Sequence, residues 1–408
     1  MTTAVRPESD SGAFPLHRTS AVPLSHPAPT RRRLDHVDLL RGLVMVIMVL
    51  DHVRGFLTNV TFDPTDMAQT NLALFGTRWI TPFCAPVFVF LAGASGWMAG
   101  TRRSPGELTR LLLTRGLWLL LLEFTVISFG WYFNFHWNDG ARAQVIWAIG
   151  ASMIVLAGLV RLPRPAIAGV GLLLVAGHNL LDGISPASLG AWAPLWMLLH
   201  VRGQLGVVPV ILVYPVLPWI GVMALGYAAG PAIFSRDPAT SRRVAWAGVA
   251  LTAGFVVLRG LNGYGDLLPR LENGGAAVVA MSFLNTTKYP PSLDYVLMTL
   301  GPALVALYAF RRAGGPLARA LVTFGRVPFL FYVAHLYLVH AIAVAAGVAE
   351  GYPLSSMLVY HGYTPAGFGF GLPVIYLVWI AVVVALYPLC RRYAELKGRS
   401  RAWWLSYL

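Results

Sequence analysis

Apolar residues occur along this chain in long runs rather than in the short alternating patterns of a water-soluble sheet. Runs of about 20 residues bounded by charges are long enough to cross the hydrocarbon core of a bilayer as helices. The pattern therefore predicts an all-α, polytopic transmembrane helix bundle of about ten spans. We expect these helices near residues 38–57, 79–99, 109–131, 144–160, 165–181, 207–230, 243–259, 292–311, 320–346 and 370–391.

The two ends of the chain differ from this apolar body. Residues 1–33 are rich in Pro, Ser, Thr and Ala without apolar periodicity, which predicts a disordered tail. The apolar stretch that follows has the length of a span and no convincing small-residue cleavage site, so we expect an anchor and not a cleaved signal peptide. A transmembrane domain is predicted over 34–395 and a short C-terminal tail over 396–408.

Composition supports the same class of protein. The chain is 57% hydrophobic and only 12% charged, whereas soluble domains are roughly 25% charged. Too few polar side chains remain to cover a water-soluble globule, and a disordered or fibrous chain is excluded equally. A lipid bilayer is the expected surroundings. The two cysteines, Cys84 and Cys390, fall near opposite predicted membrane faces, so no disulfide is expected.

The excess of basic over acidic residues is explained by the predicted membrane topology. The chain has 31 Lys and Arg against 17 Asp and Glu, a formal charge of +14. Most of the cations fall in the tails and in alternate turns, which predicts both termini in the cytoplasm of a multi-pass protein in the cell (inner) membrane. Because the arginines are spread over every inner turn, a nucleic-acid-binding function is not needed to explain the positive charge. The few predicted outer cations are Arg78, Arg142, Arg202, Arg259, Arg270 and Lys288.

The longest connections all fall on the predicted outer side, over 58–78, 182–206, 260–291 and 347–369. Long loops in a compact protein tend to carry function. The sequence shows no convincing internal repeat, no phosphate-binding glycine loop and no Cys/His spacing of a zinc site, so no metal is expected.

The first predicted helix carries five ionisable residues, each costing roughly 2.5–3.5 kcal/mol on insertion scales. Asp38 and Arg41 lie near its cytoplasmic end, and Asp51, His52 and Arg54 lie about 20 Å further along at 1.5 Å per residue. Asp38 and Arg41, like Asp51 and Arg54, are spaced i, i+3 and can pair on one helix face. For these pairs alone, a structural ion pair is the preferred explanation.

His52 is the residue that ion pairs do not explain. An imidazole, with an unperturbed pKa of about 6.5, is the natural proton acceptor at neutral pH, although a histidine satisfied within the bundle is the alternative. The helix predicted over 320–346 has Arg326 near its inner end and His335 and His340 in its outer half. Both helices thus place arginine at one level and imidazole at the other.

Three arginines are candidates for an anion pocket near the cytoplasmic side. Arg41 and Arg326 are joined there by Arg115 of the third predicted helix. Guanidinium groups pair bidentately with phosphate, which suits a phosphorylated ligand. Alternatively, these arginines snorkel to lipid phosphates or pair with Asp38 and Glu123. Both explanations stay open.

Two outer loops carry groups suited to a polar acceptor. Segment 283–295 holds Lys288 and Asp294 on either side of a rigid double proline, although a stiff turn is the simpler alternative. The first outer loop offers Asn59 and ends at Arg78 beside a tryptophan. Such a set would suit a sugar or other polyol, but aromatic residues at this depth are also ordinary interface anchors.

Several long segments of the chain resemble one known family, the heparan-alpha-glucosaminide N-acetyltransferase catalytic-domain family of transmembrane acyltransferases. The resemblance lies in the segments LDHVDLLRGLVMVIMVLDHVRGF at 34–56 and TRWITPFCAPVFVFLAGAS at 77–95. It continues in FLNTTKYPPSLDYVLMTLGPAL at 283–304 and FGRVPFLFYVAHLYLVH at 324–340. Each segment is far longer than a short motif, and together they cover most of the chain beyond the tail.

The resemblance implies an acyltransferase. An acyl group, acetyl first among the candidates, would be carried by acyl-CoA as co-substrate on the cytoplasmic side and transferred to an amino or hydroxyl acceptor, such as a glycan, on the outer side. A histidine in or near the first outer loop would be central. Loop 58–78 contains none. The nearest candidate is His52, as general base or transient acyl carrier, with Asp51 orienting it or its surroundings, and His335 is a second candidate base.

The remaining roles follow from that hypothesis. The residues expected to hold the donor are Asp38, Arg41, Arg115 and Arg326. The residues expected to face the acceptor are Asn59, Arg78, Lys288 and Asp294. A homodimer is suggested by analogy alone.

Two other classes of function compete with transfer. A secondary transporter or lipid-linked flippase also needs intramembrane charges and interrupted helices. Such a protein should show two halves with corresponding broken helices, and the sequence shows none. A structural or sensory membrane protein without turnover explains the two polar levels of the first helix least well.

Overall fold

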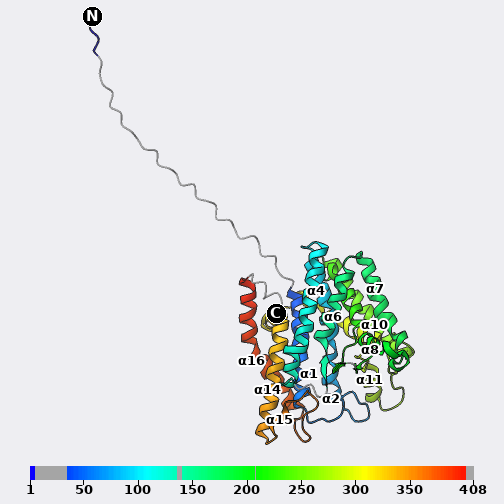
Figure 1. The fold of residues 1–408 in the computed structure, drawn as a ribbon. Coiled ribbons are helices and arrows are strands. Elements are labelled where there is room, and N and C mark those ends of the chain that lie inside the picture. The colour runs from blue at the N-terminus through cyan, green and yellow to red at the C-terminus, as the bar shows by residue number, and fades with distance from the viewer. Residues whose placement is uncertain (5–34, 136–139, 207, 401–408) are drawn as a thin grey trace. The chain divides into compact units, whose positions relative to one another are not determined.

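The computed structural model describes residues 1–4, 35–135, 140–206 and 208–400 (Figure 1). Residues 1–33 and 34–408 form separate units, and everything below concerns the second. The tail predicted over 1–33 lies outside the described residues except for the first four. The last helix extends to Arg399, beyond the predicted start of the C-terminal tail at 396.

Long apolar helices dominate the described residues, which confirms the prediction of an all-α membrane bundle. In the part of the chain that the structure describes, seven helical stretches are long and apolar enough to cross a membrane: Leu72–Gly100, Pro105–Tyr132, Arg164–Leu181, Pro238–Leu261, Leu293–Arg312, Pro328–Ala349 and Leu372–Arg399. The first helix, α1 (Asp35–Leu57), has the length of a span but is rich in charge. Two shorter apolar helices are α6 (Val145–Leu159) and α9 (Leu217–Ile233). The total of ten spans stays a prediction.

Several of the seven stretches are composites of shorter elements. The first comprises α2 (Leu72–Trp79), η1 (Thr81–Phe83) and α3 (Cys84–Gly100). The second comprises α4 (Pro105–Leu122), the π-helical η2 (Glu123–Ile127) and α5 (Ser128–Tyr132). The others are α7 (Arg164–Gly177) with η3 (His178–Leu181), α10 (Pro238–Leu261), α12 (Leu293–Ala309) with η5 (Phe310–Arg312), α14 (Pro328–Ala349) and α16 (Leu372–Arg399).

The connections contain further short elements. The helices among them are η4 (Pro186–Trp192), α8 (Ala193–Leu199), α11 (Ala276–Leu284), α13 (Gly315–Arg326) and α15 (Leu354–Met357). A small sheet has the order β1-β3-β2, from β1 (Ala141–Ala143), β2 (Gly203–Gln204) and β3 (Val210–Leu212). Strand β1 is parallel to β3 with Ala141 opposite Val210, and β2 is antiparallel to β3 with Gly203 opposite Leu212.

Two predicted boundaries are wrong. The single helix expected over 320–346 is two helices, α13 and α14, which meet at Val327 with backbone angles of −130° and 49°. Pro328 explains the break, because proline lacks an amide hydrogen and disfavours helical geometry in the residue before it. The helix expected from 207 begins only at Leu217, because β3 occupies residues before it.

The bundle has two distinguishable ends. We call one the basic end: there α9 ends, α10 and α13 begin, and Arg311 donates to the carbonyls of Ser235 and Arg236 at 3.0 and 3.2 Å. At the other end, the loop end, α1 finishes beside the segment after α15: Gly362 N donates to Gly55 O, and Phe370 N to Leu57 O. Figure 1 shows α2, α11 and α15 at this end as well.

Glycines set how closely α1 approaches its neighbour α13. A Cβ added at Gly42 would lie 1.8 Å from the carbonyl oxygen of Leu321, and one added at Gly325 would lie 1.8 Å from that of Asp38. The two backbones are therefore in contact, as small residues permit between membrane helices. Glycine also permits close backbone contact between α3 and α9, through Gly93 and Gly226.

We expect Gly325→Ala to destabilise the bundle, because the new methyl group forces α13 away from α1. Overpacking of this kind costs about 1–3 kcal/mol or more. The apparent melting temperature of purified protein in detergent should therefore fall by several degrees. The matched control is Gly158→Ala in α6, where an added Cβ meets nothing within 4 Å; it should leave the melting temperature unchanged or raise it. Equal melting temperatures for the two variants would contradict the close contact.

Candidate active site

Two groups of polar side chains lie along α1. We call the first the arginine cluster, consisting of Asp35, Asp38, Arg41 and Arg326 toward the basic end. We call the second the histidine cluster, consisting of His52, His335 and His361 toward the loop end. Arg41 and His52 are separated along α1 by about 16 Å at 1.5 Å per residue.

The arginine cluster confirms the predicted pair within α1. Arg41 Nη1 lies 3.0 Å from Asp38 Oδ1. Arg326, at the end of α13, lies 3.1 Å from Asp35 through Nη2 and 3.9 Å from Asp38 through Nε. Asp38 thus connects the two arginines that the sequence placed at one level. Arg41 also donates to the carbonyl of Gly325 and to Ser95 Oγ, at 3.3 and 3.4 Å.

A cavity of about 910 Å³ lies beside Arg326. It is formed between the start of α1, α13 and the last turns of α16, and two further arginines, Arg319 and Arg391, line it. Arg41 does not line this cavity, because its guanidinium is directed to Asp38, Gly325 and Ser95. Of the predicted donor-binding arginines, Arg326 is the one with access to a large open space.

Arg115 does not join the arginine cluster. It lies on α4, whose principal packing partner is α6, and α4 has no extensive contact with α1 or α13. Glu123, considered as a partner for the arginines, is also engaged elsewhere. It is fully buried, and its carboxylate accepts hydrogen bonds from the amides of Gln144 and Trp147 at 3.2 and 2.9 Å. It therefore caps the positive N-terminal end of α6.

The histidine cluster is built around a direct contact between two imidazoles. His52 Nδ1 lies 2.7 Å from His335 Nε2, and His335 Nδ1 lies 2.7 Å from the carbonyl oxygen of Phe331. A carbonyl only accepts, so His335 Nδ1 must carry a hydrogen, and in the neutral ring His335 Nε2 is then an acceptor. His52 Nδ1 must therefore donate to it. This leaves the lone pair of neutral His52 on Nε2.

That second nitrogen is the free basic atom of the His52–His335 pair. Among the described residues His52 Nε2 has no hydrogen-bond partner, and the side chain is partly exposed. His335, in contrast, is fully buried with both nitrogens engaged. The indole of Trp131 contacts the His52 ring edge-on, with centroids 4.8 Å apart. The pair therefore presents one fixed ring with one available base.

Sequence reasoning missed His361. It follows α15 in the outer loop predicted over 347–369, and its ring lies against Trp131 with centroids 4.9 Å apart. A Cβ at Gly55 would come within 2.6 Å of His361 Nδ1, so the glycine allows the loop to lie on α1. The only signal in the sequence was a histidine in a long outer loop. The first outer loop lacks a histidine, and the loop after α15 brings one to the histidine cluster.

His361 stays neutral at physiological pH. Burial lowers the pKa of its imidazole to about 3; the carboxylate of Asp51 opposes this shift, and nearby guanidinium groups reinforce it. His361 therefore adds no positive charge beside His52.

Asp51 contacts arginines beside His52 and, within the described residues, makes no hydrogen bond to the His52 ring. Its carboxylate lies 2.9 Å from Arg54 and 3.9 Å from Arg78, which confirms the predicted pair with Arg54. It is close enough to act on His52 electrostatically, yet the residue that holds the ring is His335. Arg78 therefore serves as a second counter-ion for Asp51. It also donates to Thr81 Oγ1 at 2.9 Å.

The other residues predicted to face an acceptor are dispersed. Lys288 is near enough to Asp51 and His52 to interact electrostatically, and its Nζ lies 5.1 Å from the ring centroid of Tyr289. Asn59 is exposed at the loop end. Asp294 is buried and lies 3.9 Å from Arg259. Of these three residues, only Lys288 lies beside the histidine cluster.

His340 is a structural histidine. Its Nδ1 lies 2.9 Å from the carbonyl of Gly130 and its Nε2 3.2 Å from that of Met357. The ring is stacked on Phe133 with centroids 4.0 Å apart. His340 is therefore held between two backbone carbonyls, of which a neutral ring can donate to one. Cys84 and Cys390 are both buried and free.

The geometry combines an accessible imidazole base, held by a second imidazole, with a separate arginine-lined cavity. This is what transfer from an activated, phosphate-bearing donor to a nucleophile requires.

Comparison with known proteins points to the same chemistry. The family described as heparan-alpha-glucosaminide N-acetyltransferase, catalytic, matches residues 33–260. No curated protein matches the chain. The matched residues include all of α1, and with it His52 and most of the arginine cluster, whereas His335 and His361 follow them in the chain. The match covers more than half of the sequence, and the chain therefore belongs to the heparan-alpha-glucosaminide N-acetyltransferase catalytic family.

Proposed function

We propose that this membrane acetyltransferase moves an acetyl group from acetyl-CoA on the cytoplasmic side to an amino or hydroxyl group of a polar acceptor, such as a glycan, on the opposite side. Family membership implies an acetyltransferase, and the seven apolar helices indicate a membrane protein. The observation that carries the proposal is the His52–His335 contact, which leaves His52 Nε2 as a free base.

The arginine-lined cavity supports the donor assignment. Arg319, Arg326 and Arg391 contribute three guanidinium groups to one space of about 910 Å³. Phosphate groups of the donor would pair with them, because guanidinium presents a planar fork that matches phosphate oxygens. Arg41 and Asp38 would act indirectly by holding Arg326 and α13 in place.

The charge distribution supports the proposed orientation. The loops and helix ends at the basic end carry Arg236, Arg242, Arg243, Arg311 and Arg312, as expected for the cytoplasmic side. The cavity lies beside the first turns of α1, and the histidine cluster lies toward the loop end. A donor bound by its phosphates near the basic end would extend its long arm toward the histidines.

The transfer step needs one proton acceptor. His52 Nε2 takes the proton from the acceptor amine or hydroxyl as the new bond to the acetyl carbon forms. The thioester bond then breaks, and the departing CoA sulfur takes that proton from His52. His335 Nε2 accepts from His52 Nδ1–H throughout and so stabilises the charged imidazolium, as an orienting residue does in a catalytic triad. Lys288 is placed to stabilise the negative charge that develops on the acetyl oxygen.

A secondary transporter or flippase is less well supported. That function requires matched halves with corresponding broken helices, and the sequence shows none. Family membership favours transfer.

We expect His52→Ala to abolish transfer while leaving donor binding intact, because it removes the base and not the arginine cavity. Acetyl transfer from labelled acetyl-CoA to a panel of amino sugars and polyols should fall at least 100-fold, with the Kd for CoA changed by less than threefold. The matched control is His36→Gln, a histidine at the other end of the same helix, which should keep near-normal transfer. Normal transfer by His52→Ala would assign the base to another residue.

We expect His335 to act through His52. His335→Gln can still accept a hydrogen bond from His52 through its side-chain carbonyl, whereas His335→Ala cannot. The alanine variant should therefore lose kcat by about 10²-fold with little change in KM, and glutamine should restore a large part of it. Equal losses in kcat for the two variants, at equal thermal stability, would mean that His335 only fills space.

We expect Arg326→Ala and Arg319→Ala each to weaken CoA binding by about tenfold or more, because each removes a charge-assisted contact to phosphate. Calorimetric titration with CoA and with dephospho-CoA would show which phosphate each arginine meets. Arg161→Ala, an exposed arginine in the turn between α6 and α7, is the control. Unaltered affinity in both variants would exclude the cavity as the donor site, while leaving the assignment of His52 to its own test.

A further inference from the structure

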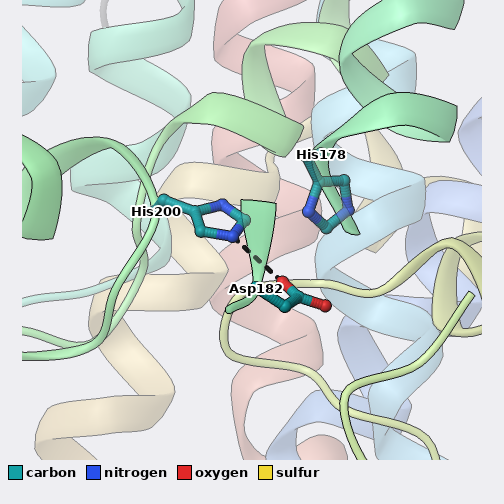
Figure 2. A group of neighbouring side chains, drawn as sticks. All are labelled: His178, Asp182 and His200. Carbon is teal, nitrogen blue, oxygen red and sulfur yellow. Dashed lines mark hydrogen bonds and ion pairs between the residues drawn. The ribbon is translucent and has the colours of Figure 1, made fainter. Parts of the chain in front are cut away.

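A second group of titratable side chains lies outside the two clusters of α1. It consists of His178, Asp182 and His200, and Figure 2 shows the two rings and the carboxylate facing one space. His178 begins η3 where α7 ends, Asp182 follows η3, and His200 follows α8. One ligand atom from each residue lies within 4.8 Å of those of the other two.

The two histidines of this group are buried without enough partners. His178 and His200 are each 2% exposed. Within the described residues neither ring nitrogen of His178 has a hydrogen bond of ordinary geometry, and Nδ1 of His200 also has none. The carbonyl of Pro291 lies near the His178 ring without closing such a bond. Leaving a buried polar nitrogen unpaired costs about 1–3 kcal/mol, so a bound partner is the natural explanation.

The carboxylate is held in place by neighbours. Asp182 Oδ1 lies 3.0 Å from His200 Nε2, and Asn179 Nδ2 donates to Asp182 Oδ2 at 2.8 Å. Asn179 in turn accepts from the amide of Leu293 at 3.0 Å. Metal-binding carboxylates and imidazoles usually have such outer partners, which fix their orientation. The Pro291 carbonyl is an acceptor of the kind that holds the second N–H of a metal-bound imidazole.

The donor set selects the type of ion. Two imidazole nitrogens and one carboxylate oxygen suit a divalent transition metal, Zn²⁺ above all, and leave a coordination position open. Because the three ligand atoms are at most 4.8 Å apart, some point lies within about 2.8 Å of all three. Zinc–ligand distances are about 2.0–2.2 Å. Movements of well under 1 Å, within the reach of small side-chain rotations, would bring all three into range.

We propose that His178, Asp182 and His200 bind a divalent transition metal ion, with Zn²⁺ the best fit. The ion ties the turn after α7 to the end of α8 and, through Asn179, to the first turn of α12. A metal-free ion pair between Asp182 and His200 is the competing explanation, and it leaves His178 without a partner. The proposal is independent of the acetyl transfer assigned to His52.

The test is metal binding by the full-length protein in detergent, purified without a histidine tag because such a tag binds the same ions. After chelator treatment and desalting, Zn²⁺ titration against a competing chromophoric chelator should give one tight site per chain. Co²⁺ should give the visible spectrum of a site with nitrogen and oxygen ligands. Zn²⁺ should also raise the melting temperature. A wild-type protein that takes up no stoichiometric Zn²⁺ or Co²⁺ would overturn the proposal.

Variants assign the site to these residues. His178→Gln and Asp182→Asn should each weaken Zn²⁺ binding at least 100-fold and remove the thermal shift, and His36→Gln should behave as wild type. If a ligand variant fails to fold, Asn179→Ala tests the same site, because loss of an outer partner should weaken binding about 10- to 100-fold. Stoichiometric binding with unchanged affinity in the folded variants would place the metal elsewhere and overturn the assignment.

Discussion

The polar side chains of α1 have to be satisfied inside the bundle, because the hydrocarbon core of a bilayer offers no water to pair with them. The structure meets this constraint with three arrangements along one helix. Asp38 is shared by Arg41 and Arg326, Asp51 faces Arg54, and His52 contacts His335. In each arrangement, the partner of the α1 side chain comes from α1 itself or from a neighbouring helix. Within the described part of the chain His52 Nε2 is left without a hydrogen-bond partner, and on the proposed function this nitrogen is the catalytic base.

Close backbone packing makes these pairings possible. Gly42 and Gly325 bring α13 so near to α1 that Arg326 reaches Asp35 and Asp38. The break before Pro328 then allows α14 to leave in its own direction, with His335 placed beside His52. A continuous helix over this region would fix the positions of Arg326 and His335 relative to each other by helical geometry alone. Two helices let each residue meet its own partner on α1.

The sequence could predict whatever depends on local spacing. The ion pairs within α1 follow from residues three apart, and both are present. The same spacing rule explains why the described contacts of Asp51 go to arginines and not to His52: consecutive residues of a helix point about 100° apart, so they do not face each other. Pro328 was a sequence signal for the helix break, but the prediction of one helix over 320–346 used only the length of the apolar run.

Long-range contacts could not be predicted in this way. His361 reaches the histidine cluster through a loop whose position depends on Gly55, and Arg115 is kept apart because α4 packs on α6. The group of His178, Asp182 and His200 has no recognisable metal-site spacing. It forms only because the segment after α7 folds back against the end of α8.

The position of the histidines bears on how an imidazole mechanism persists without a histidine in the first loop. Acid–base chemistry depends on where a basic nitrogen lies and how its ring is held, and not on which segment supplies it. Here His52 comes from α1 and its holder from α14, so the ring is fixed by two packed helices. A base on a helix is placed more rigidly than one on a loop, because neighbouring side chains restrict its rotamers. On the proposed function, the catalytic geometry therefore depends on the same α1 contacts that satisfy the buried charges.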